Sequence, residues 1–153
     1  MKLIPNFKLV NRKAKHEFFF VQTFEAGIVL QGTEVKSVRM GRVNMSDAYC
    51  RIDNGELFLQ GLHISEYNYG TYNNHHAKRP RKLLLKKREI KKLHGKVKER
   101  GYSIVPYRLY LNERNFIKVG IALAKGKNTY DKRHVLKEKD AKRSLQRAMK
   151  DLY

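Results

Sequence analysis

The stretch IVPYRLYL (residues 104–111), followed by FIKVGIALA (116–124), decides the fold class of this chain. Both segments alternate between two kinds of position, and a period of two is typical of strands with one buried face. Asn112 to Asn115 supply a turn between them, so the pair predicts a β-hairpin. The residues predicted to share a face are Val105, Tyr107, Leu109 and Leu111 on the first strand, and Ile117, Val119, Ile121 and Leu123 on the second.

Further strands are expected upstream of this hairpin. The segments EFFFVQTF (17–24) and GIVLQGTEV (27–35) are rich in aromatic and β-branched residues, and residues 25–27 are predicted to turn between them. Residues 37–42 have room for one helical turn.

A second hairpin is predicted around Asn54-Gly55. This pair favours a type I′ turn, because both central positions of that turn need a positive φ. The flanking segments, residues 47–52 and 56–59, are its two strands.

Residues 68–100 have a different character. The first part, NYGTYNNHHAKRPRK (68–82), is polar and predicts a loop. The second, KLLLKKREIKKLHGKVKER (82–100), predicts a basic helix that ends or breaks at Gly95. The apolar stripe of this helix is Leu83, Ile90, Leu93 and Val97. The whole pattern favours a mainly β fold with inserted helices, in the form of an OB-fold-like small β-barrel.

The charge of the chain points to a polyanionic partner. Lys and Arg number 34 against 14 Asp and Glu, which gives a formal net charge of +20. Such an excess of cations is suited to phosphate neutralisation, so nucleic acid is favoured over a membrane. No apolar run approaches the roughly 18 residues of a transmembrane helix. The single cysteine, Cys50, excludes an intrachain disulfide and fits a reducing, cytoplasmic location.

Residues that carry enzyme chemistry are scattered. His75 and His76 are adjacent, but their side chains need not converge, and there is no second cysteine for a thiolate cluster. No G-x-S-x-G, P-loop or carboxylate cluster is present. The sequence therefore predicts a protein that is not an enzyme and has no metal ion or cofactor.

The charge is concentrated in two places. Lys78-Arg79-Pro80-Arg81-Lys82 predicts an extended, phosphate-binding surface, with a solvated loop as the alternative. Residues 126–153 predict a basic tail that follows a body of residues 1–125 and has too little apolar surface to fold alone. A helix in this tail is marginal in water, and docking in an RNA-lined groove is favoured over pairing with a partner helix.

Three separated blocks, in order, resemble one known family, the SmpB (small protein B) family of bacterial trans-translation. The blocks are FEAGIVLQGTEVKSVRMGRVNMSDAY (24–49), RPRKLLLKKREIKKL (79–93) and AKGKNTYDKR (124–133). The resemblance covers nearly the whole chain from Asn11 onward. It implies an OB-fold-like barrel with embedded helices, a C-terminal tail that is disordered when free, and no catalytic activity.

The resemblance also implies a mechanism. A member of this family binds the tRNA-like domain of tmRNA, the SsrA RNA, around its elbow and D-arm. It delivers alanyl-tmRNA, with elongation factor Tu, to ribosomes stalled on truncated messages, for rescue and for tagging of the incomplete proteins. Its tail enters the vacant mRNA channel beyond the decoding centre and becomes helical there. The expected partners are therefore tmRNA, elongation factor Tu and the ribosome.

Positions can be carried over from the resemblance. The RNA-binding residues fall on Asn11, His16, Glu25, Leu84 and Lys86, with Arg81 and Lys82 as phosphate contacts. The decoding-centre residues of the tail fall on Gly126, Lys127, Tyr130, Asp131, Lys132, Arg133 and Lys137. Glu25 is expected to accept hydrogen bonds from base or 2′-hydroxyl donors, and Leu84 to pack on an exposed base. The residues alone favour a turn position for Glu25 and a core position for Leu84.

Two other classes of protein share these features. A structural ribosomal protein is also small and basic, and it binds ribosomal RNA stoichiometrically. A non-specific single-strand binder would present an exposed aromatic platform and would discriminate poorly between folded and unstructured RNA.

Overall fold

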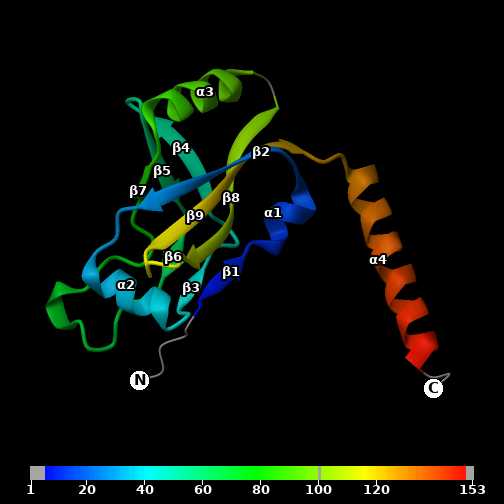
Figure 1. Cartoon of the computed structure of the whole chain (residues 1–153), viewed down its shortest axis with the longest axis horizontal. Helices are drawn as coiled ribbons and strands as arrows, with labels where there is room; N and C mark the ends of the chain where they lie inside the picture. Colours follow the sequence, from blue (N-terminus) through cyan, green and yellow to red (C-terminus); the bar gives the residue numbers. More distant parts are fainter. Residues whose placement is uncertain (1–5, 100, 151–153) are drawn as a thin grey trace.

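The predicted hairpin is present as β8 (Tyr102–Leu111) and β9 (Ile117–Gly126), shown in Figure 1. The structure is a computed structural model that describes residues 6–99 and 101–150, apart from the side chains of Thr129 and Tyr130. The two strands pair antiparallel along their length. All four apolar residues predicted to share a face of β9 lie in the main core, as their alternation indicated.

The prediction that Val105 and Tyr107 share a face with Leu109 and Leu111 is wrong. The register of β8 against β9 shifts at Pro106–Arg108, which marks a β-bulge. Beyond the bulge the two leucines pack with the main core, whereas Val105 and Tyr107 pack on the outer side of the sheet against the first helix. A strict period of two cannot anticipate this change of face.

The strands close into a barrel. In the order β8, β4, β5, β7, β2, β9 each strand pairs with the next, and β9 also pairs with β8. The additional bounds are β1 (Lys8–Val10), β2 (Phe18–Ile28), β4 (Tyr49–Asp53), β5 (Glu56–Gln60) and β7 (Arg81–Leu84). The core inside the ring consists mainly of fully buried aliphatic residues such as Leu57, Leu83 and Ile121. The predicted fold class, mainly β with inserted helices around an OB-fold-like barrel, is confirmed.

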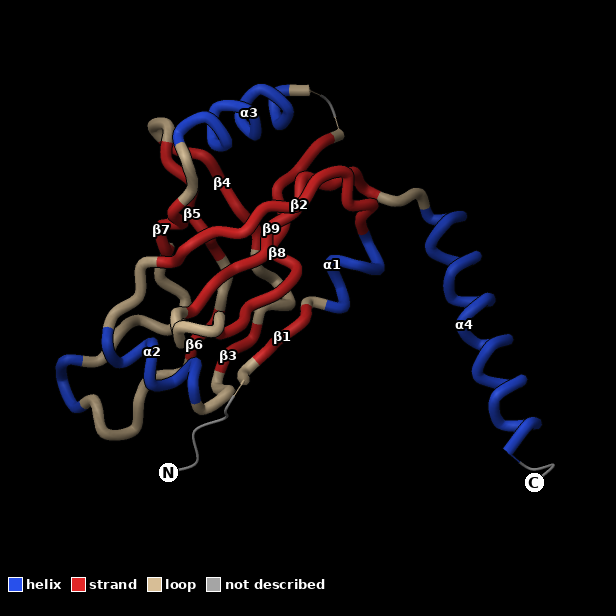
Figure 2. Tube along the Cα trace, viewed as in Figure 1, coloured by secondary structure: helices blue, strands red, loops and turns tan. Residues whose placement is uncertain are grey.

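Helices and short strands surround this barrel. They are α1 (Arg12–Glu17), α2 (Gly32–Arg39), β3 (Val43–Asn44), β6 (His63–Ile64), the 3-10 helix η1 (Thr71–Asn73), α3 (Lys87–Lys98) and α4 (Thr129–Lys150). Figure 2 shows α3 at one end of the barrel, α2 at the other, and α4 standing away from both.

Residues 25–35 do not fold as predicted. β2 runs through the expected turn at residues 25–27 and pairs with β9 as far as Gly27. The rest of the segment is not a strand, because α2 begins at Gly32. The Glu34 carboxylate accepts the backbone N–H of Gln31 at 2.7 Å and so caps this helix. The predicted helical turn at 37–42 is in part the end of α2.

The hairpin around Asn54-Gly55 is confirmed. β4 and β5 pair antiparallel from Tyr49 with Gln60 to Asp53 with Glu56. The two turn residues have φ values of 47° and 74°, as a type I′ turn needs.

The predicted helix over 82–100 begins later than expected. Residues 81–84 form β7, which pairs with both β2 and β5, so Leu83 lies in a strand and not in a helical stripe. α3 starts at Lys87, and Gly95 lies inside it without ending it. Pairing with two neighbouring strands, which no local pattern reveals, outweighs helix propensity here.

Candidate nucleic-acid interface

Glu25 is exposed on the outer face of β2, where a neighbouring strand holds its side chain. The hydroxyl of Tyr110, on β8, donates a hydrogen bond to the Glu25 carboxylate across β9. Burial, together with this hydrogen bond, raises the pKa of Tyr110 to about 12. Tyr110 therefore remains a donor at neutral pH, and it orients the carboxylate of the exposed Glu25.

Leu84 lies beside Glu25 on the same outer face. β7 runs antiparallel to β2 with Leu84 opposite Gly27, and residues two apart on a strand share a face. The side chain of Leu84 is 52% exposed, which is unusual for a leucine next to a packed core. A Cβ atom at Gly27 would lie 3.2 Å from that of Leu84, so the glycine lets this side chain lie close to β2.

Lys86 follows at the start of α3, with its side chain exposed. Its backbone N–H donates to the Glu89 carboxylate at 3.0 Å, which caps the helix. β7 ends at Leu84, two residues before Lys86, so Lys86 lies where the chain leaves the sheet and enters α3. A carboxylate and an exposed leucine thus lie on one outer face, and an exposed lysine follows the leucine by two residues.

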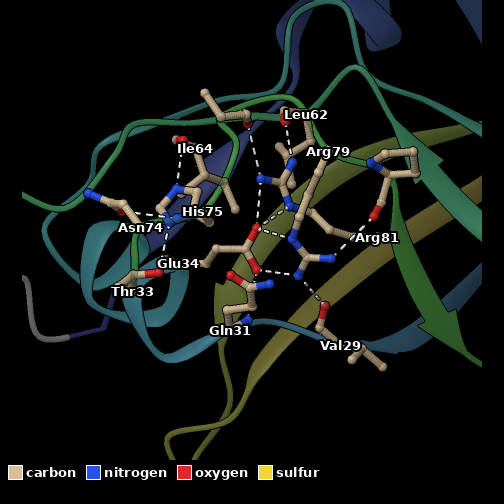
Figure 3. A network of polar contacts seen from close by, with 12 residues as sticks. Val29, Gln31, Thr33, Glu34, Leu62, Ile64, Asn74, His75, Arg79 and Arg81 are labelled. Carbon is tan, nitrogen blue, oxygen red and sulfur yellow. Dashed lines mark hydrogen bonds and ion pairs between the residues drawn. The ribbon is translucent and has the colours of Figure 1, made fainter. Parts of the chain in front are cut away.

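Arg81 is not available to a phosphate, contrary to the role expected for it. Its side chain is fully buried, and its guanidinium donates to Glu34 at 2.8 Å and to the carbonyl oxygens of Leu62 and Ala77 (Figure 3). Glu34 is also fully buried. Although burial opposes its ionisation, hydrogen bonds from Arg79, from the Gln31 backbone and from Arg81 hold the pKa of Glu34 below its ordinary value.

Two further cations of the basic run at 78–82 are also paired within the protein, whereas Lys78 is exposed. Arg79 donates to Glu34 at 2.9 Å, and Lys82 pairs with Glu56 at 2.6 Å. Both side chains are partly exposed, so Lys82 keeps some access to solvent. The prediction of a continuous phosphate-binding ribbon is therefore wrong, because two of its four cations share one buried carboxylate.

The loop before this run is held by His75, which is buried. One ring nitrogen lies 2.9 Å from the Thr33 hydroxyl and the other 3.0 Å from the Ile64 carbonyl oxygen, as Figure 3 shows. His76 is exposed, so the adjacent histidines do not converge. Within residues 6–99 and 101–150 no group of three or more His, Cys, Asp or Glu side chains is arranged to hold a metal ion. Burial raises the pKa of the Cys50 thiol, which keeps it in the weakly nucleophilic protonated form.

Asn11 and His16 lie at the opposite end of β2 from Glu25. Asn11 is buried and caps α1: its amide oxygen accepts the Ala14 N–H, and its NH₂ group donates to the carbonyls of Met45 and Pro106. Its polar atoms are therefore used inside the protein, and it sets the position of α1. His16, in the last turn of that helix, is partly exposed.

The base of the tail is fixed to α1 and β2. The backbone N–H of Lys127 donates to the Glu17 carbonyl at 2.8 Å, and its ammonium donates to the Lys15 carbonyl at 3.2 Å. The same ammonium lies 4.8 Å from the centre of the exposed Phe19 ring. Gly126 ends β9 opposite Phe18, so the predicted tail begins at the last residue of the barrel.

Beyond Lys127 the tail forms α4, which carries exposed cations along its length. Arg133 and Lys137 are exposed, and Asp131 and Lys132 are partly buried. The side chain of Tyr130 lies outside the described part of the chain. Among the described tail residues, His134 and Glu138 form an ion pair at 3.2 Å. Disorder of the free tail stays a prediction.

The sequence of this chain is similar to those of one family of known proteins. A family model described as "SmpB protein" matches residues 8–151, nearly the whole chain. The chain belongs to the SmpB family. Its curated relatives include the SsrA-binding proteins of Bacillus velezensis, 56% identical over 92% of this chain and 90% of the relative, and of Desulforamulus reducens, 51% identical over 92% and 88%.

A solved structure supports SmpB membership through the fold. It is described as "tmRNA-SmpB: a journey to the center of the bacterial ribosome" and matches with a TM-score of 0.67 and 46% sequence identity. The match covers 80% of this chain and 85% of the other. In the described part of this SmpB-family chain, no helix has both the length and the apolar character needed to cross a membrane.

Sequence reasoning missed the residues that surround Glu25 on the outer sheet face. Tyr110 and Arg108 come from β8, far along the chain; Tyr110 reaches Glu25 across β9, and Arg108 lies against the Tyr110 ring. The one local signal was Pro106 inside a predicted strand, since a proline there favours a bulge and a change of face.

Proposed function

We propose that this chain binds the tRNA-like domain of tmRNA and brings alanyl-tmRNA to stalled ribosomes in trans-translation. The match to the SmpB family over residues 8–151 carries this proposal. Relatives more than half identical are SsrA-binding proteins, and the matched structure is of tmRNA and SmpB at the ribosome. Work at the ribosome means a cytoplasmic protein, with elongation factor Tu as a further partner in delivery.

The open edge formed by Glu25, Leu84 and Lys86 is the proposed centre of RNA recognition. A carboxylate fixed by Tyr110 accepts hydrogen bonds from base NH or 2′-hydroxyl groups, and a phosphate would be repelled there. The exposed Leu84 offers an apolar surface to an unstacked base, while Lys86 and the partly exposed Lys82 supply phosphate contacts. This combination selects a folded RNA, because charge alone attracts any RNA.

His16 and Asn11 have different proposed parts at the far end of β2. The partly exposed His16 contacts the RNA, and the buried Asn11 positions it by capping the helix that carries it. His16 therefore acts by direct contact with the RNA, whereas Asn11 acts from inside the fold by holding α1 in place.

The tail is the proposed sensor of the empty mRNA channel. Within the described residues, exposed tail cations such as Arg133 and Lys137 form no ion pair with a carboxylate, so they are free to replace counterions along ribosomal RNA. Lys127 fixes the direction in which the tail leaves the body. In this proposal, the tail residues between Gly126 and Lys137 that the family resemblance assigns to the decoding centre bind there. The segment that follows them lies in the mRNA channel.

A competition titration tests this function. The purified full chain is bound to a folded tRNA-like fragment of tmRNA and competed with an unstructured RNA of equal length, at two salt concentrations. A preference for the folded fragment that persists at the higher salt supports the proposal. Equal binding that collapses with salt would favour a ribosomal protein or a non-specific binder.

A further inference from the structure

The outer face of the sheet beside Glu25 carries a second group of side chains. β9 lies between β2 and β8, and the register places Glu25 opposite Gly120, and Gly120 opposite Arg108. Two residues away from Gly120 on β9, Lys118 lies opposite Tyr110. Side chains from all three strands thus meet on one surface, although they are far apart in the sequence.

Arg108 lies against two aromatic rings on this surface. Its guanidinium carbon is 4.6 Å from the ring centre of Tyr110 and 5.4 Å from that of Tyr107. Tyr107 also contacts Phe20, with ring centres 5.4 Å apart. These contacts hold the planar guanidinium in one orientation before any ligand is bound.

Gly120 makes this arrangement possible. A Cβ atom there would lie 2.6 Å from Arg108 Cγ and 2.8 Å from Tyr107 Cζ, distances that real structures do not tolerate. The absence of a side chain on β9 therefore lets the arginine and the tyrosine lie flat across the strand. Any larger residue would lift both away.

Arg108 also lacks an internal partner of the kind that Arg79 and Arg81 have. Within the described residues it forms no ion pair with a carboxylate, and its Nε atom is buried without a hydrogen-bond acceptor. The nearby carboxylate of Glu25 is bonded to Tyr110 instead. The buried Nε is closed to a ligand, but within the described residues the two terminal nitrogens of Arg108 also form no hydrogen bond. A fixed guanidinium with these two donors unused is suited to an oxyanion such as phosphate.

We propose that Arg108, stacked on Tyr107 and Tyr110 above Gly120, binds a backbone phosphate of the same RNA that Glu25 reads. This inference rests on the proposed function and extends its site across β9 to β8. The carboxylate on β2 and the guanidinium on β8 are separated by β9 and favour opposite ligand groups. Glu25 takes a base or 2′-hydroxyl donor and Arg108 the phosphate, so the pair fixes the orientation of the strand.

The test is a salt series of binding to the folded tRNA-like fragment, with the full chain and the Arg108→Met variant. Loss of a charge-assisted contact should weaken binding about tenfold or more. Loss of one phosphate contact should also lower the slope of log affinity against log salt by about one. Arg108→Lys should keep the slope and recover only part of the affinity, because an ammonium neither stacks nor binds in two-pronged fashion.

Arg51→Met is the matched control, since Arg51 is an exposed arginine on β4, which pairs with β8 on the side opposite β9. It should leave both affinity and slope close to those of the original chain. Gly120→Ala should weaken binding without removing any charge, because it displaces Arg108. Thermal unfolding of each variant separates this effect from a loss of fold.

The outcomes distinguish this inference from the proposed function. If Arg108→Met keeps the original affinity and slope while Glu25→Ala weakens binding, the phosphate site on β8 is refuted and the function stands. If the unaltered chain shows no preference for the folded fragment, the proposed function fails, and this inference fails with it.

Discussion

The basic run at residues 78–82 and the basic helix α4 are both dense in Lys and Arg but differ in their surroundings. In the run, Arg79 and Arg81 share the buried carboxylate of Glu34, and Lys82 pairs with Glu56. In α4, the described residues from Arg133 onward are mostly exposed, and the ion pair among them joins His134 to Glu138. The same residue types therefore stabilise the fold in one region and remain available to a polyanion in the other.

The difference comes from where the neighbouring carboxylates lie. Glu34 reaches Arg81 because α2 packs near the loop that enters β7, and this proximity exists only in the folded chain. The helix α4 stands away from the barrel (Figure 1), and among the described residues the ion pair that involves α4 joins two of its own residues, His134 and Glu138. Density of positive charge alone does not identify an RNA-binding segment.

The largest effect is expected from Glu34→Gln. It leaves a fully buried arginine without its counter-charge, so the free energy of unfolding should fall by roughly 3–5 kcal/mol. Urea denaturation measures this. The control is Glu56→Gln, which breaks the partly exposed pair with Lys82 and should cost less than about 1 kcal/mol. Equal losses in the two variants would mean that the buried network has no special role.

The same network should make stability depend on acid. The folded-state pKa of Glu34 lies below its ordinary value of 4.5, so its contribution is complete above that pH and is lost as the pH falls through the folded pKa. The stability difference between the original chain and Glu34→Gln should therefore shrink below pH 4.5. Denaturation at a series of pH values measures it, and a difference that grows toward acid would contradict the assignment.

Removing charge from the tail should change binding to the ribosome and leave the stability of the barrel unchanged. Replacing Lys142 and Arg143 by glutamine should leave the unfolding of the barrel unchanged, because both side chains are exposed. Binding to ribosomes with an empty mRNA channel should lose about two units of salt slope, one for each phosphate contact. Arg79→Gln is the counterpart and should lower stability while keeping the slope. A fall in barrel stability on tail substitution would show that the tail docks on the body.

The smallest effect concerns the helix of the tail. Ala141 is exposed in the middle of α4, and Ala141→Gly should weaken the helix by about 1 kcal/mol. A peptide of residues 126–153 should show little helix in water by circular dichroism, and the glycine variant still less. Channel binding by the full chain should weaken by several-fold at most. A stable helix in the free peptide would remove ordering by the ribosome from the mechanism.

Local patterns predicted the parts of the fold that local chemistry determines. The alternation on β9 and the positive φ of Asn54 and Gly55 are properties of short segments, and the structure has both. The extension of β2 and the strand at Arg81–Leu84 depend on distant partners, β9 for the first and β5 with β2 for the second. Periodicity carries no information about those pairings.

In the candidate site, too, some residues could be placed from the sequence, and others depend on the fold. Family resemblance placed Glu25 and Leu84 at the RNA, and both are exposed on the outer face, although residue type alone favoured a turn and a core position. It also placed Arg81 there, but a fully buried arginine cannot contact a phosphate. Arg108 went unnoticed because the bulge in β8 changes the face on which residues 105–107 lie, and because β2, which carries Glu25, is brought beside β9 only by the strand order.

One measurement tests the separation of body and tail most directly. A chain ending at Tyr130 is compared with the full chain for affinity toward the folded tRNA-like fragment and for tagging of incomplete proteins on stalled ribosomes. The barrel and its outer face remain intact in the shorter chain, so the affinity should change little while tagging is abolished. Tagging at the original level by the shorter chain would contradict the role of the tail as the sensor of the empty channel.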